Sequence, residues 1–184
     1  RLLPDNARIK SGSIEFEGQD LTKVSKKTLR AIRGQKIAMI FQDPMSSLNP
    51  LIPVGKQVSE MIRIHHPGES GEELQKRTIE LFRQVRIPEP EKRYKSFPHE
   101  FSGGMRQRAM IAMALANKPE LLIADEPTTA LDVTIQDQIL KQLRSLQKEY
   151  GTSIIFITHD LGVVAELCDR VVVLYGWLIM EEAP

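Results

Sequence analysis

Four short apolar runs constrain the fold of this chain more than any other feature of its sequence. Between the later runs the spacing is helical: Ile135, Ile139 and Leu143 share one face, and a shorter helix is expected near residues 161–167. Buried strands joined by helices are typical of a parallel α/β sheet, which binds ligands beyond the carboxyl ends of its strands. Chemistry is therefore expected at those ends. The four runs are residues 37–41, 121–124, 154–157 and 171–174.

Residues 54 to about 116 follow a different pattern. Val54, Val58 and Ile62 are spaced for one face of a helix, as are Leu74 and Leu81 further along. Loops rich in proline and glycine separate these helices, so we expect a helical insert between the first and second apolar runs. Before the first apolar run, alternating apolar and charged residues at 13–18 predict a half-exposed strand.

Composition excludes several classes of protein. The 184 residues allow one domain with a subdomain, and 25 Lys and Arg against 24 Asp and Glu exclude a strongly basic nucleic-acid footprint. A single cysteine, Cys168, excludes an internal disulfide and favours a reducing compartment. The longest apolar run, residues 171–180, is far short of the roughly 20 residues that span a bilayer. We therefore expect a soluble, intracellular protein.

Two carboxylates follow the second apolar run. Asp125 could hold Mg²⁺ and Glu126 could deprotonate an attacking water, because both would stand at the carboxyl end of a buried strand. The alternative is a strand that simply ends in a solvated turn, and both interpretations fit this segment alone.

His159 follows the third run and is expected at the same edge of the sheet. There its imidazole could touch a terminal phosphate or the water that attacks it. A capping histidine, or a surface pair with Asp160, explains the segment equally well. The placement of Glu126 and His159 at the ends of two strands of one sheet favours the functional interpretation.

Ser102, Gly103, Gly104 and Met105 open an apolar helix. Ser102 is a good N-cap, and the two glycines leave backbone N–H groups open to close approach. Such a helix start suits a phosphate. An ordinary serine-capped helix after a flexible loop is the alternative.

Gln42 and Asp132 are weak candidates on their own. Gln42 follows the first apolar run and could reach a metal ion or the attacking water with its amide. Asp132 precedes a helix and resembles an N-cap, which is compatible with a role in a subunit contact.

The order of these segments is more specific than any one of them. Together they resemble the ATP-binding subunit of ABC transporters over nearly the whole chain. Residues 41–50 and 125–136 are further similar to the dipeptide and oligopeptide importer branch. Nickel and other small-solute importers share much of this sequence, so the resemblance leaves the solute open. Met105, where the wider family usually has Gln, resembles the residue found in one of the branch's two paired ATPases. In that family's terms, Gln42 resembles the Q-loop, residues 102–105 the signature motif, residues 121–126 Walker B, residues 130–132 the D-loop and His159 the H-loop.

The resemblance implies a fold and a domain organisation. It implies an α/β, parallel-sheet P-loop NTPase core over residues 1–42 and 119–184, with a small antiparallel β portion. A helical subdomain over residues 43–118 would carry the signature motif.

It also implies roles and partners. Two such subunits, identical or related, would pair head to tail around ATP. Glu126 would activate water, His159 would contact the γ-phosphate, and Asp125 and Gln42 would serve Mg²⁺. Residues 102–105, Gln42 and Asp132 would bind nucleotide, and Gln42 would link the site to the membrane subunits. The chain would be peripheral, bound from the cytoplasmic side of the membrane to integral membrane permease subunits. A periplasmic or extracellular solute-binding protein would be an indirect partner, and nucleic acid no partner.

One departure from the family is large. The chain contains no Gly-x-x-x-x-Gly-Lys-Ser/Thr loop to cradle the β- and γ-phosphates. In the family this loop precedes a segment like residues 1–6, so we expect a fragment truncated before residue 1 and inactive alone. A second, smaller departure lies at Gly176, one position earlier than the family's usual hairpin glycine. Trp177 beside it is expected to be an ordinary packed or exposed aromatic residue.

Two other functions fit the same residues. One is a soluble ABC-type ATPase that acts on ribosomes or DNA, against which the near-zero net charge and the sequence of residues 46–50 count. The other is a non-catalytic subunit that supplies a signature helix to its partner.

Overall fold

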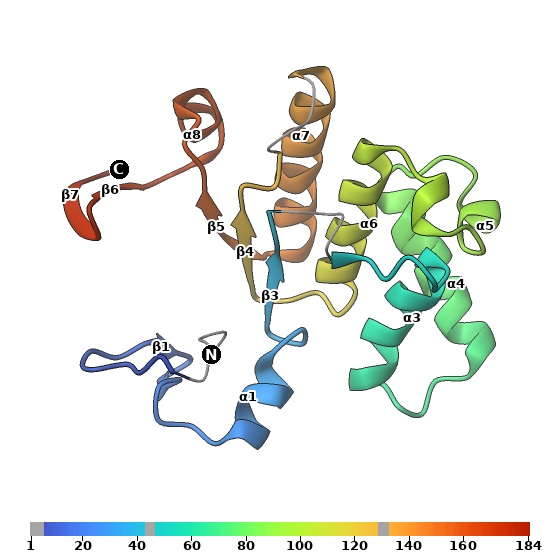
Figure 1. Ribbon diagram of the computed structural model, residues 1–184, viewed down its shortest axis with the longest axis horizontal. Coiled ribbons are helices and arrows are strands. Elements are labelled where there is room, and N and C mark those ends of the chain that lie inside the picture. Colours follow the sequence, from blue (N-terminus) through green and yellow to red (C-terminus); the bar gives the residue numbers. More distant parts are fainter. Residues whose placement is uncertain (1–5, 43–46, 129–132) are drawn as a thin grey trace. The chain divides into compact units, whose positions relative to one another are not determined.

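The structure, a computed structural model, describes residues 6–42, 47–128 and 133–184. It divides into two compact units, Arg1–Arg33 and Gly34–Pro184, and each is described by itself (Figure 1). The smaller unit holds an antiparallel pair, β1 (Glu15–Phe16) and β2 (Gln19–Asp20), followed by helix α1 (Lys26–Ile32). The strand predicted over residues 13–18 is shorter than expected, because the chain turns back at Glu17 and Gly18 with φ angles of 49° and 72°.

The larger unit contains the predicted parallel sheet. Its order is β3-β4-β5, with β4 in the middle, and the ladders align Ile40 with Ala124 and Ala124 with Phe156. The three carboxyl ends therefore lie along one edge of the sheet. The strands are β3 (Ile37–Ile40), β4 (Leu121–Asp125) and β5 (Ser153–Ile157).

The chain between β3 and β4 is helical, as the spacing predicts. Val54, Val58 and Ile62 are fully buried on one face of α3, and α6 is buried on nearly all sides against α3, α4 and β3. The expected helical insert is confirmed, while its limits as a subdomain over residues 43–118 remain a prediction. The elements are α3 (Val54–His65), α4 (Gly71–Gln84), α5 (Pro90–Arg93), the 3₁₀ turn η1 (Pro98–Glu100) and α6 (Gly103–Leu115).

Two helices follow strands of the sheet. Helix α7 (Val133–Tyr150) buries Ile139 and Leu143 in the same apolar cluster as α6, and α8 (Leu161–Leu167) follows β5. Both match the helices predicted from spacing. No helix in the described ranges is long and apolar enough to cross a membrane.

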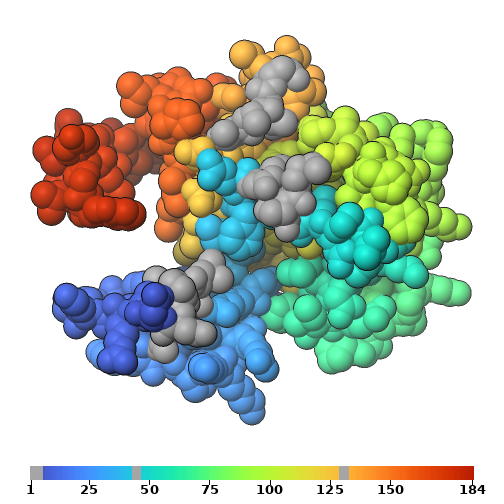
Figure 2. Space-filling view, viewed as in Figure 1, coloured from blue at the N-terminus to red at the C-terminus, as the bar shows by residue number. Residues whose placement is uncertain are grey.

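The fourth apolar run differs from expectation. Instead of a buried strand of the parallel sheet, β6 (Val171–Tyr175) forms its own antiparallel pair with β7 (Leu178–Ala183). Gly176 and Trp177 close the hairpin with φ angles of 55° and 69°, so β6 pairs with the strand that immediately follows it. The side chains of residues 172–175 are exposed, and Trp177 is 100% exposed. Figure 2 shows this hairpin, in red, at the surface. The small antiparallel β portion that the fold class includes is seen in two pairs, β1–β2 and β6–β7.

Candidate active site

Three polar side chains meet at the carboxyl edge of the sheet. Gln42 Nε2 donates to Glu126 Oε2 at 2.9 Å, and His159 Nδ1 lies 3.2 Å from Glu126 Oε1. Gln42 comes two residues after β3, Glu126 directly follows β4, and His159 comes two residues after β5. We call Gln42, Glu126 and His159 the strand-end cluster. The parallel register brings together residues that lie 84 and 33 positions apart in the chain.

The backbone at Glu126 aims its carboxylate into the cluster. Glu126 has a φ of 43°, in the left-handed region that side chains other than glycine seldom adopt. Such a conformation costs on the order of 1–3 kcal/mol and clusters at active sites, although turns such as those at Glu17 and Trp177 also adopt it. The Glu126 N–H still donates to Ile157 O at 2.9 Å, so the chain remains attached to β5 as it turns.

The cluster has the groups needed for proton transfer at an anionic substrate. An ionised carboxylate only accepts hydrogen bonds, so Gln42 donates to it and leaves its own carbonyl oxygen as an acceptor. His159 can donate from Nδ1 and present Nε2 to a ligand, and its side chain is 77% exposed against 24% for Glu126. A sheltered base beside an accessible imidazole is an arrangement suited to activating water.

Asp125 is the last residue of β4 and pairs in register with Ile157. It is half-buried. Its carboxylate and the carbonyl oxygen of Gln42 are hard oxygen donors, the ligands that Mg²⁺ prefers. No group of three or more His, Cys, Asp or Glu residues in the described ranges could hold a metal unaided. Asp125 and Gln42 suit Mg²⁺, which is commonly held by one or two protein groups together with substrate phosphates and water.

The loop that carries His159 is held by Asp160. The Asp160 carboxylate caps α8 by accepting from Gly162 N at 2.9 Å, and it accepts from Gln136 Nε2 on α7 at 3.0 Å. These bonds, that from Gln136 foremost, lower the pKa of Asp160. Asp160 is thus the capping residue, and His159 pairs with Glu126 rather than with Asp160. The sequence offers no local signal for Gln136, because its partner lies 24 residues away.

The start of α6 is the second element of the site. Ser102 Oγ accepts from Met105 N at 3.3 Å, which confirms the predicted N-cap. Nothing lies within 4 Å of the position that a Cβ would take at Gly103, so this turn is open to a ligand. A Cβ at Gly104 would lie 3.0 Å from Ile135 Cγ2, so the glycine allows α6 to approach α7 closely. An open helix start with free N–H groups suits an anion.

Asp132, together with residues 43–46, lies outside the described residues, so its predicted role stays a prediction.

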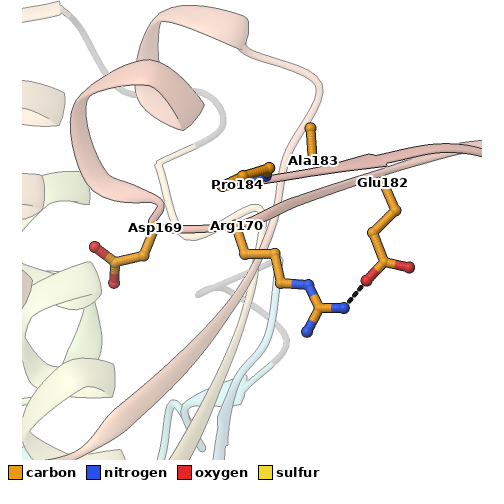
Figure 3. A pocket seen from close by; sticks show the side chains of 5 residues that line it. All are labelled: Asp169, Arg170, Glu182, Ala183 and Pro184. Atoms are coloured by element: carbon orange, nitrogen blue, oxygen red, sulfur yellow. Dashed lines mark hydrogen bonds and ion pairs between the residues drawn. The ribbon is translucent and has the colours of Figure 1, made fainter.

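The hollow drawn in Figure 3 is lined by Asp169, Arg170, Glu182, Ala183 and Pro184, and Arg170 forms an ion pair with Glu182 across it. None of its residues belongs to a sequence motif, so we place the chemistry at the sheet edge instead.

Two curated relatives are similar to this chain over most of its length. The chain is 56% identical over its whole length to a probable peptide ABC transporter ATP-binding protein, y4tR, of Sinorhizobium fredii, covering 55% of that protein. It is 61% identical over 172 residues to the oligopeptide transport ATP-binding protein OppD of Bacillus subtilis, covering 94% of this chain and 48% of that protein. The chain thus spans about half the length of these curated relatives.

A solved structure and a family match complete the comparison. The dimeric ATP-binding cassette MJ0796, in a post-hydrolysis state bound to ADP and Pi, has a TM-score of 0.84 and 31% identity, covering 95% of this chain and 73% of that one. The likeness confirms the α/β fold class with its parallel sheet and helical region. The family described as ABC transporter matches residues 1–129, well over half of the sequence. This chain therefore belongs to the ABC transporter family.

Proposed function

We propose that this chain is part of the ATP-hydrolysing subunit that powers peptide uptake by an ABC importer. The strand-end cluster carries the proposal, because it sets a carboxylate, an amide and an imidazole at one edge of a parallel sheet. The relatives named for peptide and oligopeptide transport support the solute class.

In the proposed reaction Glu126 acts as the general base. It takes a proton from water as the water oxygen bonds to the γ-phosphorus of ATP, while the bond from that phosphorus to the bridging oxygen breaks and ADP leaves with the electron pair. Gln42 holds the Glu126 carboxylate through its amide and can orient the water with its carbonyl oxygen. His159 presents its second ring nitrogen toward the γ-phosphate. Positioning and charge stabilisation supply most of the catalysis in such transfers.

Asp125 and the carbonyl oxygen of Gln42 are the residues that would hold Mg²⁺. The ion, when bound, neutralises charge on the β- and γ-phosphates. Both groups supply oxygen, and both lie at the same edge of the sheet, because Asp125 ends β4 and Gln42 comes two residues after β3.

The remaining site residues would act between two subunits. The open start of α6, residues 102–105, offers N–H groups to a nucleotide held by a second ATPase subunit, and Asp132 would lie at the same contact. The dimeric state of MJ0796 supports this pairing. This chain would bind from the cytoplasmic side of the membrane to integral membrane permease subunits, which complete the transporter, and a solute-binding protein would deliver the peptide to them.

The experiment is to purify the full-length protein by an affinity tag and identify what accompanies it. We expect integral membrane subunits, and an ATPase activity that these subunits stimulate when they are reconstituted with a peptide-loaded binding protein. Copurification with ribosomes or DNA, with no membrane subunit, would favour a soluble ATPase instead. Tight association with permease subunits without any hydrolysis would indicate a non-catalytic subunit.

A further inference from the structure

A buried guanidinium links three helices behind the start of α6. Arg108 lies on α6 and is 7% exposed. Its Nη1 donates to Val85 O and to Gln142 Oε1, both at 3.0 Å, and its Nη2 donates to Gln138 Oε1 at 3.0 Å. Val85 caps the end of α4, and the two glutamines lie one turn apart on α7. We call Arg108, Gln138 and Gln142 the Arg108 joint.

The joint extends along α7. While Gln142 Oε1 accepts from Arg108, its Nε2 donates to Gln84 O at 2.7 Å. The Tyr150 hydroxyl then donates to Gln84 Oε1 at 2.7 Å, and burial raises the pKa of that tyrosine. The end of α4 is thus attached to α7 at two points more than two turns apart.

The joint places a charge where an apolar side chain would cost less. The acceptors of Arg108 are a main-chain carbonyl and two amides, all uncharged. Burial, followed by the neighbouring charge of Arg86, lowers the pKa of Arg108, although a guanidinium remains protonated at physiological pH. A buried charge often stabilises a fold less than a well-packed apolar side chain would. Arginine alone supplies a rigid, planar set of donors that reaches acceptors on separate helices at once.

The joint stands one helical turn behind a second contact with α7. Gly104 and Arg108 are four residues apart, so both lie on one face of α6. At Gly104 the helix start packs against Ile135 of α7, and at Arg108 the guanidinium binds Gln138 and Gln142 of the same helix. These two contacts together fix the direction of the start of α6 relative to α7, in addition to the packing of α6 against α3, α4 and β3.

We propose that Arg108 is a positioning residue that holds α6 against α7, so that residues 102–105 meet a nucleotide bound by a second subunit in one fixed orientation. This inference rests on the proposed function. Arg108 does not itself touch nucleotide. Its loss should therefore weaken association across the nucleotide while leaving each subunit's own ATP binding unchanged.

The test measures ATP-dependent association of the full-length protein in a Glu126→Gln background, where ATP persists because its hydrolysis is blocked. Sedimentation velocity gives the association constant with and without Mg-ATP, and calorimetry at low protein concentration gives ATP binding by the single subunit. The variants are Arg108→Met and Arg108→Lys. The second keeps the positive charge but loses the planar set of guanidinium donors. Arg106→Met is the matched control, because Arg106 lies on the same helix outside the Arg108 joint and its Nε donates to Pro98 O of η1 at 2.8 Å.

We expect both Arg108 variants to weaken ATP-dependent association roughly 10- to 100-fold, since small misplacements cost about that much. Single-subunit ATP binding should change less than about twofold, and Arg106→Met should match the background. Gln142→Leu, which removes an acceptor but leaves Arg108, should reproduce the Arg108 phenotype. Unchanged association in the Arg108 variants, a parallel loss of single-subunit binding, or full rescue by lysine would each overturn the proposal.

The result is separable from a failure of the proposed function. If the parent protein hydrolyses ATP and Glu126→Gln stops it, but the Arg108 variants associate normally, only the positioning role falls. If the parent protein does not hydrolyse ATP, and its subunits do not associate when ATP is present, both proposals are overturned.

Discussion

The strand-end cluster and the Arg108 joint use the same chemistry in opposite surroundings. In the cluster, Glu126 is partly sheltered and His159 is mostly exposed, so its hydrogen bonds can be exchanged for bonds to water or substrate. In the joint, Arg108 and Gln142 are buried and Gln138 is exposed, and the bonds of Arg108 and Gln142 run to other parts of the protein. Exposed polar contacts can be remade during a reaction, whereas buried ones are costly to break.

The difference separates chemistry from geometry. The cluster is built from residues that follow strands, where a register of hydrogen bonds sets their positions. The joint is built from side chains on helices, which have no shared hydrogen-bond ladder, so side-chain contacts must fix the position of one helix against the next. We therefore expect mutations in the cluster to change hydrolysis with little effect on stability, and mutations around the α6–α7 contact to change both.

The largest effect is expected from Glu126→Gln in the full-length protein. The substitution keeps the shape but removes the base, so ATP turnover should fall by at least about 100-fold. ATP binding, measured by calorimetry, should persist. Turnover close to that of the parent protein would remove Glu126 from its assigned role.

His159→Ala should have the next largest effect. The variant loses the contact with Glu126 and the second nitrogen available to phosphate, so hydrolysis should fall roughly 10- to 100-fold. Because the side chain is 77% exposed, the melting temperature should hardly change. His99→Ala is the control: His99 is exposed and stacks on Phe97, with ring centroids 5.8 Å apart, outside the cluster. Equal losses in the two variants would contradict the role of His159.

A pair of glycine variants tests the α6–α7 contact. Gly104→Ala brings a methyl group 3.0 Å from Ile135 Cγ2, and the overpacking should destabilise the protein by about 1 kcal/mol even after the better helix propensity of alanine is counted. Gly103→Ala has open space and should be neutral or slightly stabilising, by up to about 1 kcal/mol. Urea unfolding of both variants measures the difference, and equal stabilities would show that α7 does not limit the start of α6.

The smallest effect is expected from Asp160→Asn, and it depends on pH. Hydrogen bonds from Gln136 and the start of α8 lower the pKa of Asp160 in the folded state, so the ionised group stabilises the fold above its unfolded pKa, near 3.8. That contribution is lost as the pH falls through the folded pKa. The melting temperature of the variant should therefore be slightly below that of the parent protein at pH 7, and this difference should shrink as the pH falls below 3.8. A loss that grows toward low pH would contradict this assignment.

Local patterns predicted the parts of the fold that depend on nearby residues. The spacing of Ile139 and Leu143 gave α7, the helix expected near residues 161–167 is α8, and Ser102 caps α6 as expected. The meeting of Glu126 and His159 also followed, because parallel strands end at one edge.

The features that the sequence did not predict depend on partners far along the chain. Residues 171–174 form an apolar run that fits a buried parallel strand and a hairpin strand equally well, and only the turn at Gly176 and Trp177 separates the two. Arg108 gives no local signal, since its acceptors lie 23, 30 and 34 residues away. Long-range polar contacts have no period in the sequence.

The central claim is that Gln42 and His159 both act through the Glu126 carboxylate. A double-mutant cycle tests it most directly: single-turnover ATP hydrolysis is measured for the full-length protein, for Gln42→Ala, for His159→Ala and for the double variant. Since both side chains bind one carboxylate, the double variant should lose clearly less than the product of the two single losses. A double variant whose loss equals that product would show that the two residues act independently, and would contradict the account.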